Sequence, residues 1–357
     1  MTVITIGSRE SQLAMIQTVH VQSMLRERYP EHEFRIKGMT TTGDQVLEVA
    51  LAKIGSKSLF TKELEVALAS NQVDLVVHSL KDLPTDLPEG MTIAAVLERE
   101  DPRDAVVMSL KHGSSHSSLS SLPDGSIVGT SSVRRSAQLK RRFPNVISKD
   151  IRGNLNTRLR KLDDEDSQYD ALVLAYAGVH RMGWTDRVSE ILNVDTMLYA
   201  VGQGALAIEC RQNDAFINGL VAPLTHHDTA LRCFAERAFM RSLEGGCSVP
   251  LGVSTQLLDD TENRHSTNAE VEHSHSRTPT SNPQSTRSLV LIGSVTRLDG
   301  SHEIRDSVSM TIPDDSPASA IATAETLGRS VAAMLVEKGA KSILNEIRCV
   351  SPPLKEK

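Results

Sequence analysis

The stretch VITIGSRESQL, residues Val3–Leu13, contains a short apolar strand, a turn of small residues that includes an arginine, and the beginning of a helix. The same order returns in IVGTSSVRRSAQL, residues Ile127–Leu139. Two such units predict two similar lobes that face a cleft. The free N–H groups at the beginning of each helix favour the binding of an anion, and the arginine side chains add paired hydrogen-bond donors. The simpler alternative is that Ser or Thr side chains cap these helices.

The alternation of strand and helix patterns continues through the first two thirds of the chain, which is typical of an α/β fold. The predicted strands are Val3–Ile6, Phe34–Ile36, Leu75–Val77, Ile93–Val96, Ala105–Met108, Ile127–Val128 and Ala171–Leu174. The first predicted strand is followed by a helix, which ends at Pro30. Its apolar side consists of Leu13, Ala14, Ile16, Val21, Met24 and Leu25.

The last third has a different pattern, which predicts a small α+β domain. A long helix, residues 228–243, ends at Glu244–Pro250, where two glycines and a proline stop it. Predicted strands at Leu251–Leu257, Leu289–Val295 and Ser307–Ile312 precede a final helix whose apolar stripe ends at Leu335. The polar segment Asp259–Ser288 predicts a disordered insertion, and its His265, His273 and His275 fit a solvated loop better than a metal site.

Length and composition place the chain among soluble globular proteins. Its 357 residues suggest two or three domains, with 39% hydrophobic residues, 24% charged residues and a formal charge of −6. No apolar run reaches the roughly 18 residues that span a bilayer, and the beginning lacks the layout of a signal peptide, so we expect a cytoplasmic protein without a membrane partner. The four cysteines show no CxxC spacing, which disfavours disulfides and zinc.

Positive charge is concentrated in residues 128–161, which hold ten basic residues against the single acid Asp150. A cationic region inside an acidic protein indicates a local anionic ligand. Aromatic residues make up only 3% of the chain, so stacking platforms for nucleic acid are scarce and we expect no nucleic-acid partner. The alternative is a solvated basic helix.

Two further segments carry candidate site residues. Lys81 and Asp82 follow the strand Leu75–Val77, at the strand end where open α/β sheets bind ligands, although a surface ion pair is the alternative. The turn Arg152–Arg158 begins another helix, with Asn154 as its expected cap. Four arginines thus gather near two helix starts, namely Arg134, Arg135, Arg152 and Arg158. Because no GxxxxGK[ST] loop is present, a ligand rich in carboxylates is favoured over a nucleotide.

Physical reasoning alone does not single out a reactive cysteine. Cys247 follows two glycines at the end of a helix, where the helix dipole disfavours a thiolate, so a half-buried structural thiol is the better interpretation. Cys210 lies in an apolar run that suits the core, and Cys233 lies within the long helix.

Over nearly its whole length the chain resembles the porphobilinogen deaminase (hydroxymethylbilane synthase) family. The segments that carry this resemblance are Gly7–Arg9, Lys57–Leu64, Asp74–Pro84, Gly129–Arg135, Ile151–Arg158, Tyr199–Leu206 and Glu244–Pro250. The resemblance implies two lobes like periplasmic binding proteins, each with a mixed sheet, and a small α+β domain. It also implies a dipyrromethane cofactor joined by a thioether to Cys247, which reverses the interpretation of that cysteine as merely structural.

The resemblance further implies an enzyme, a transferase that condenses four molecules of the substrate porphobilinogen head to tail with loss of ammonia. Water then releases hydroxymethylbilane for heme and tetrapyrrole biosynthesis. Asp82 and Lys81 would be the catalytic residues. Asp82 would stabilise the electron-poor azafulvenium that forms when ammonia leaves, with Lys81 beside it. The expected carboxylate ligands are Arg9, Ser11, Lys81, Arg134, Arg135, Arg152 and Arg158, and hydrogen bonds would come from Ser79, Thr130, Ser131 and Ser132.

The resemblance also predicts domain boundaries: residues 1–100 with 201–224, residues 101–200, and residues 225–357. It implies a monomer and a mobile lid over residues 43–58. Glu10 departs from the family pattern, because a basic residue is common there. Two other functions remain: a two-lobed carboxylate-binding protein without catalysis, and a nucleotide-dependent enzyme, which would need the phosphate loops that this sequence lacks.

Overall fold

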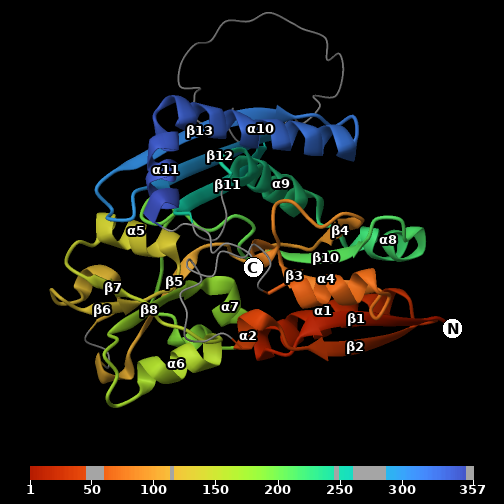
Figure 1. The fold of residues 1–357 in the computed structure, drawn as a ribbon, viewed down its shortest axis with the longest axis horizontal. Coiled ribbons are helices and arrows are strands. Elements are labelled where there is room, and N and C mark those ends of the chain that lie inside the picture. Colours follow the sequence, from red (N-terminus) through yellow and green to blue (C-terminus); the bar gives the residue numbers. More distant parts are fainter. Residues whose placement is uncertain (46–59, 113–115, 245–248, 260–286, 351–357) are drawn as a thin grey trace, which may run out of the picture.

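In the part of the chain that the structure describes, three sheets form the frame, and helices cover each of them (Figure 1). The computed structural model describes residues 1–45, 60–112, 116–244, 249–259 and 287–350, and of residues 44–45 and 347–350 it describes the backbone alone. None of the helices in these ranges is both long and apolar enough to cross a bilayer.

The first sheet has the strand order β2-β1-β3-β10-β4. Its strands are β1 (Val3–Arg9), β2 (Glu33–Met39), β3 (Leu75–Ser79), β4 (Met91–Val96) and β10 (Leu206–Arg211). β1 runs parallel to both of its neighbours, whereas β10 runs antiparallel to β3 and β4. Helices α1 (Gln12–Arg28), α2 (Thr42–Gln45), α4 (Lys62–Ala69) and α8 (Ala215–Val221) belong to this lobe.

The second sheet repeats this plan with the order β7-β6-β8-β5-β9. Its strands are β5 (Asp104–Met108), β6 (Ile127–Gly129), β7 (Ile147–Lys149), β8 (Ala171–Ala175) and β9 (Glu190–Ile191). β6 lies between two parallel neighbours, as β1 does, and β5 is antiparallel to its neighbours. Helices α5 (Val133–Arg142), α6 (Leu155–Asp163) and α7 (Tyr176–Arg181) accompany it. The two predicted lobes, each with a mixed sheet, are therefore confirmed.

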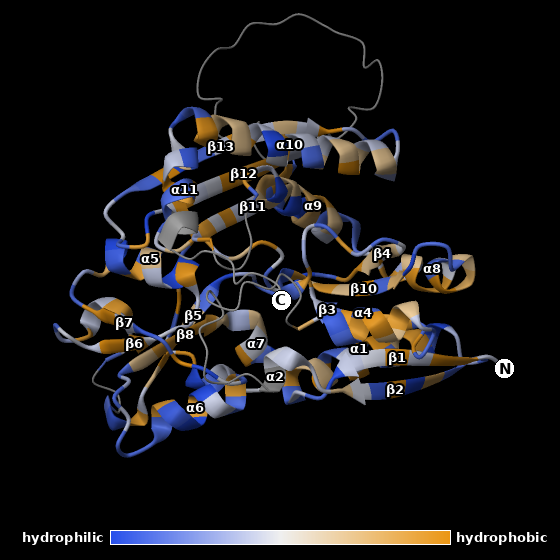
Figure 2. Ribbon diagram, viewed as in Figure 1, coloured by the Kyte–Doolittle hydropathy of each residue, from blue (hydrophilic) through white to orange (hydrophobic). Residues whose placement is uncertain are grey.

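The third sheet is antiparallel and consists of β11 (Leu251–Asp259), β12 (Arg287–Thr296) and β13 (Glu303–Ile312). Helices α9 (His227–Ser242), α10 (Pro317–Glu337) and α11 (Ala340–Val350) pack with it, which confirms a small α+β unit. In Figure 2 hydrophobic and hydrophilic residues alternate along α10, and its apolar stripe, including Leu327, Val331 and Leu335, is buried in the core of this unit. In Figure 1, α9 lies between this sheet and β4 and β10 of the first lobe.

One expectation needs correction. The insertion predicted at Asp259–Ser288 is shorter, because Asp259 pairs with Arg287 as the last rung of β11 and β12. Residues 260–286, with the three histidines predicted to lie in a solvated loop, lie outside the described part of the chain.

The buried face of α1 is less apolar than its sequence pattern suggests. Gln17, Thr18 and Gln22 are buried together with Val21 and Leu25, because other elements satisfy their polar groups. Thr18 donates a hydrogen bond to Ser8 at 2.7 Å, and Gln22 donates one to the carbonyl of Phe34 at 2.8 Å. Buried polar groups of this kind cost little when they are paired.

Candidate active site

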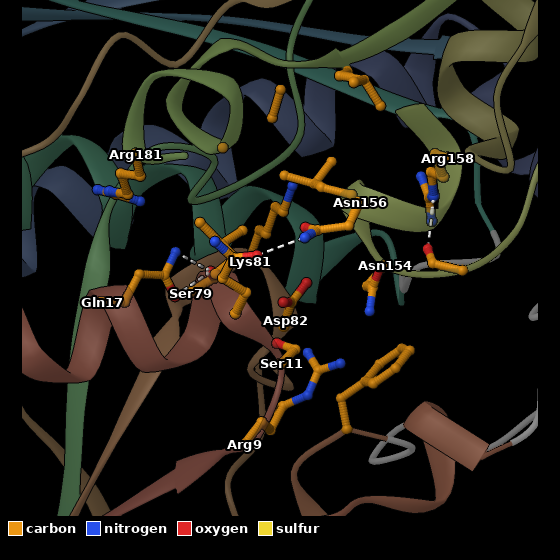
Figure 3. A pocket seen from close by; sticks show the side chains of 18 of the residues that line it. Arg9, Ser11, Gln17, Ser79, Lys81, Asp82, Asn154, Asn156, Arg158 and Arg181 are labelled. Atoms are coloured by element: carbon orange, nitrogen blue, oxygen red, sulfur yellow. Dashed lines mark hydrogen bonds between the residues drawn. The ribbon is translucent and has the colours of Figure 1, made fainter. Parts of the chain in front are cut away.

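A cavity of about 540 Å³ lies between the two α/β lobes and draws its lining from both. The first lobe contributes Arg9, Ser11, Gln12, Gln17, Ser79, Lys81 and Asp82, and the second contributes Ser131, Arg135, Arg152, Asn154, Asn156, Arg158 and Arg181 (Figure 3). The walls meet where the side-chain amide of Asn156 donates a hydrogen bond to the Gln12 side chain. The cavity is cationic, because the arginines and Lys81 outnumber the lining acids Glu10 and Asp82.

The arginines reach the cavity because strands and helices meet at three capped turns. Ser11 caps α1 by accepting a hydrogen bond from the N–H of Ala14, and Ser132 caps α5 by accepting one from the N–H of Arg135, both at 3.4 Å. Asn154 caps α6 by accepting a hydrogen bond from the N–H of Thr157 at 3.0 Å, as predicted. The capping alternative is thus correct for these side chains, while Ser11 and Asn154 also line the cavity.

Lys81 and Asp82 stand on a tight turn directly after β3. This turn is the 3-10 helix η1 (Leu80–Asp82), and it ends with a hydrogen bond of 3.2 Å that the N–H of Leu83 donates to the Leu80 carbonyl. Leu80 and Leu83 are buried on either side, so the two charged residues between them project into the cavity. Figure 3 shows the Asp82 carboxylate between the Arg9–Ser11 turn and the residues Asn154 and Asn156.

The environment of Lys81 is unfavourable for its positive charge. Burial lowers its pKa to about 8, and the nearby charges of Arg135 and Arg134 act in the same direction, against Asp82 and Asp104, which raise it. An ammonium group in such surroundings gains more from an incoming anion than an exposed lysine does. Lys81 is therefore suited to bind a ligand carboxylate.

The α6 turn supplies two more cations. Arg158 folds back over its helix start and donates a hydrogen bond from Nε to the Gly153 carbonyl at 2.8 Å, as predicted. Gly153 has a φ of +109°, a conformation that side chains disfavour. Burial lowers the pKa of Arg158 to about 10, and Arg135 and Arg152 contribute like charges. Arg152 pairs through Nε with the exposed Asp150 at 3.0 Å, and this contact does not use the donors on its two terminal nitrogens.

Arg134 and Arg135 differ in where they point, although they are adjacent in sequence. Both pair with the fully buried carboxylate of Asp104, Arg134 through Nη1 at 2.7 Å and Arg135 through Nη2 at 2.8 Å. Although burial opposes ionisation, the two guanidinium groups hold the pKa of Asp104 well below its usual range. Arg135 also lines the cavity, whereas Arg134 donates instead to the Leu198 carbonyl at 2.7 Å.

The cavity brings together nine of the predicted site residues: Arg9, Ser11, Ser79, Lys81, Asp82, Ser131, Arg135, Arg152 and Arg158. Three others do not line it. Arg134 is occupied with Asp104, Ser132 caps α5, and the buried Thr130 accepts a hydrogen bond from the N–H of Ser132 at 3.2 Å. Cys247 lies outside the described residues.

Other sequence predictions near the site have mixed outcomes. The predicted lid, residues 43–58, is described only as far as Gln45, and Gly43 lines the cavity. Glu10 also lines it and accepts a hydrogen bond from Thr40 at 2.7 Å. Cys210 is a buried free thiol, as predicted for a core residue, and Cys233, which lies within α9 as predicted, is a buried free thiol as well.

Sequence reasoning missed several lining residues. Gln17 donates a hydrogen bond to the Ser79 hydroxyl at 3.0 Å, and Arg181 donates one to the Gly204 carbonyl at 2.7 Å. Phe60 lies under the Arg9 guanidinium, 4.4 Å from its Cζ to the ring centre. Of these residues, Arg181 alone had a sequence signal that could have identified it. It ends the short helix α7, which directly follows the apolar strand β8, and the predicted site arginines also lie close to the ends of strands.

Comparison with known proteins gives matches along almost the whole chain. Residues 4–219 match the family model "Porphobilinogen deaminase, dipyromethane cofactor binding domain", and residues 230–337 match "Porphobilinogen deaminase, C-terminal domain". The porphobilinogen deaminase of Synechococcus elongatus is 48% identical over 96% of this chain and 95% of its own length. That of Gloeobacter violaceus is 49% identical over 96% and 93%.

Among solved structures, the chain is similar to the periplasmic aliphatic sulphonate binding protein SsuA from Escherichia coli. The TM-score is 0.36 and the identity 14%, over 68% of this chain and 70% of that one. The assignment rests instead on the family models and on the full-length relatives. The chain belongs to the porphobilinogen deaminase family.

Proposed function

We propose that the cavity between the two α/β lobes is the active site and that Asp82 is its catalytic residue. The reaction is that of the family, in which four porphobilinogen molecules are condensed head to tail on a covalent dipyrromethane primer, with release of ammonia at each condensation. Hydrolysis then releases hydroxymethylbilane for heme and tetrapyrrole biosynthesis. The enzyme is a transferase.

The residues that line the cavity fit a dipyrromethane group. Pyrroles of this pathway carry acetate and propionate arms, so the group brings several carboxylates, and the cavity offers buried cations from both lobes. Its volume of about 540 Å³ is in the range of small-molecule sites. We assign the carboxylates to Arg9, Lys81, Arg135, Arg152 and Arg158, with hydrogen bonds from Ser11, Ser79 and Ser131. We also propose Cys247 as the attachment point, by resemblance.

The cations act as binding groups and as counter-charges. Each hydrogen bond between a charged donor and a carboxylate contributes about 1.5–3 kcal/mol. Arg158 is pre-positioned by its hydrogen bond to the Gly153 carbonyl, and Lys81 by its place on the η1 turn. Little side-chain freedom is therefore lost when a carboxylate binds. Arg135 is held in place by hydrogen bonds to Asp104 and to the Val173 carbonyl, and its side chain lines the cavity as a counter-charge.

Asp82 supplies the negative charge that the reaction needs. Loss of ammonia from porphobilinogen leaves a positively charged, electron-poor pyrrole. A carboxylate about 4 Å away, at an effective dielectric constant near 20, stabilises such a charge by roughly 4 kcal/mol, which corresponds to about a thousandfold in rate. The observation that carries this proposal is that Asp82 opens into the same cavity as Lys81, Arg135 and Arg158.

Replacement of the Asp82 carboxylate by an amide tests this role. We expect Asp82→Asn to keep its cofactor and to lower the single-turnover rate of ammonia release by about a thousandfold, because the amide carries no charge. The control is Asp86→Asn, since Asp86 lies four residues further along and its side chain is 70% exposed. If Asp82→Asn reacts within a few-fold of the unaltered enzyme, Asp82 is not the catalytic residue.

Domain boundaries, oligomeric state and compartment are further parts of the proposal. We propose domains at residues 1–100 with 201–224, 101–200 and 225–357, which is supported by the fact that each described sheet draws its strands from only one of them. By family resemblance we also propose a monomer that acts in the cytoplasm. Sedimentation at several protein concentrations tests the monomer, and a concentration-dependent dimer would contradict it.

A further inference from the structure

Arg237 of α9 is a buried cation that forms no ion pair with any carboxylate in the described part of the chain. Its residue exposure is 3%. Burial lowers its pKa to about 10, and the charge of Arg241 adds to this, against Cys233, Asp86 and Glu209. Burying a charge without a carboxylate partner costs folding free energy. The contacts that Arg237 makes offer a functional reason for its position.

The contacts of Arg237 converge on the backbone that follows Asp82. Nη1 donates a hydrogen bond to the Leu83 carbonyl at 3.2 Å, and Nη2 donates to the carbonyls of Pro84 and Thr85 at 2.6 and 3.3 Å. One guanidinium group thus fixes three consecutive carbonyl groups. A planar group with several donors in a rigid fork can do this, whereas an apolar side chain of the same volume cannot.

The same helix also holds the η1 turn through apolar packing. Leu80 and Leu83, which flank Lys81 and Asp82, belong to one buried cluster with Ala230 and Cys233 of α9. Asp82 therefore stands on a turn that is fixed on one side by apolar packing and at its exit by Arg237. Arg237 and the α9 part of this cluster belong to the C-terminal α+β unit, while Val96 of β4 and Ala207 of β10 add apolar packing from the lobe that carries Asp82.

We propose that Arg237 is a positioning residue that sets where the Asp82 carboxylate lies relative to the growing pyrrole chain. α9 ends at Ser242, five residues before Cys247, so the helix that fixes the catalytic turn also leads to the proposed attachment point. This inference rests on the proposed role of Asp82.

The test compares Arg237→Met with two controls in the holoenzyme. Arg241→Met removes a neighbouring arginine whose side chain is 45% exposed and which, among the described residues, pairs with the Thr85 carbonyl and Asp86. Val331→Ala weakens the core of the same α+β unit without touching the η1 turn. For each variant we would measure cofactor loading by intact mass, the melting temperature, and kcat and KM well below that temperature.

We expect Arg237→Met to load its cofactor and to lose about ten- to a hundredfold in kcat, because a small misplacement of a catalytic group costs that much. KM should stay within about twofold, since the carboxylate-binding arginines are unchanged. Both controls should keep kcat within twofold. Arg237→Met with an unaltered kcat, or a kcat loss that Val331→Ala reproduces at equal loss of melting temperature, overturns the proposal.

Arg237→Lys keeps the test decisive if the methionine variant does not fold. A lysine retains the cation but lacks the planar fork, so we expect a several-fold lower kcat with unchanged KM. An unaltered kcat in a folded lysine variant also overturns the proposal. Asp82→Asn distinguishes a failure of this inference from a failure of the proposed function. If Asp82→Asn is inactive while the Arg237 variants are fully active, only the positioning role of Arg237 fails. If Asp82→Asn is active, the proposed catalytic role of Asp82 fails as well.

Discussion

Arg135 donates two hydrogen bonds to a single oxygen of Asp104, from Nε at 3.1 Å and from Nη2 at 2.8 Å. The other Asp104 oxygen accepts a hydrogen bond from Arg134 at 2.7 Å. Two guanidinium groups therefore share one carboxylate in the protein interior. One positive charge remains in excess, and it faces the cavity through Arg135, because Arg134 is turned away.

Asp104→Asn tests whether this carboxylate holds the pair together. The variant leaves two buried guanidinium groups without a counter-charge, which costs about 3–5 kcal/mol when one partner of a buried pair is removed. We expect the free energy of unfolding, measured in urea, to fall by that amount at pH 7. A loss below 1 kcal/mol would show that the arginines find other partners.

Arg134→Met and Arg135→Met form a matched pair of variants. Each removes one guanidinium from Asp104, so both should lose comparable stability. Only Arg135 lines the cavity, and we expect only Arg135→Met to impair cofactor loading or an early elongation step, by tenfold or more. Intact mass and the distribution of intermediates measure this. Equal defects in both variants would mean that cavity lining does not distinguish the two arginines.

Lys81 should make cofactor loading depend on pH. Because burial, followed by the charges of Arg135 and Arg134, lowers its pKa to about 8, Lys81 loses its positive charge as the pH rises through 8. We expect loading of the apoprotein with porphobilinogen to slow above pH 8, by up to roughly tenfold for each pH unit. Lys81→Arg keeps its charge, and its loading should stay constant over this range.

The same group also contributes to the pH dependence of stability. An unfolded lysine titrates near 10.4, so between about pH 8 and 10.4 the unfolded chain binds more protons than the folded chain, and the Lys81 contribution to stability rises with pH. Lys81→Met should therefore stabilise the protein at pH 7 more than at pH 10.

The pH profile of cofactor loading decides the binding role of Lys81. If the unaltered protein and Lys81→Arg have identical profiles, Lys81 does not bind a ligand carboxylate.

Local signals explain why much of the frame was predictable. The strands that lead to the arginine turns, β1 and β6, have apolar runs followed by small residues, and Ser11 and Asn154 are helix caps that sequence alone indicates. The position of Lys81 and Asp82 at the end of β3 follows from the same reasoning. Each of these features depends on residues close together in the chain.

Features that depend on distant partners were not predictable. β10 joins the first sheet because Leu206 pairs opposite Ser79 of β3, and no local pattern encodes such a pairing. Gln17 reads as an ordinary helix residue until it meets Ser79. The difference between Arg134 and Arg135 comes from Asp104, which lies on another strand. Family resemblance, and no physical signal, distinguished Cys247.

The most direct test of the central claim is the intact mass of the purified protein before and after a limited amount of porphobilinogen is added. We expect the protein to exceed the mass of its chain by one dipyrromethane, and then to gain up to four increments of porphobilinogen less ammonia. Cys247→Ser should keep the bare chain mass and form no product. Production of the linear tetrapyrrole by Cys247→Ser at the unaltered rate would contradict the account.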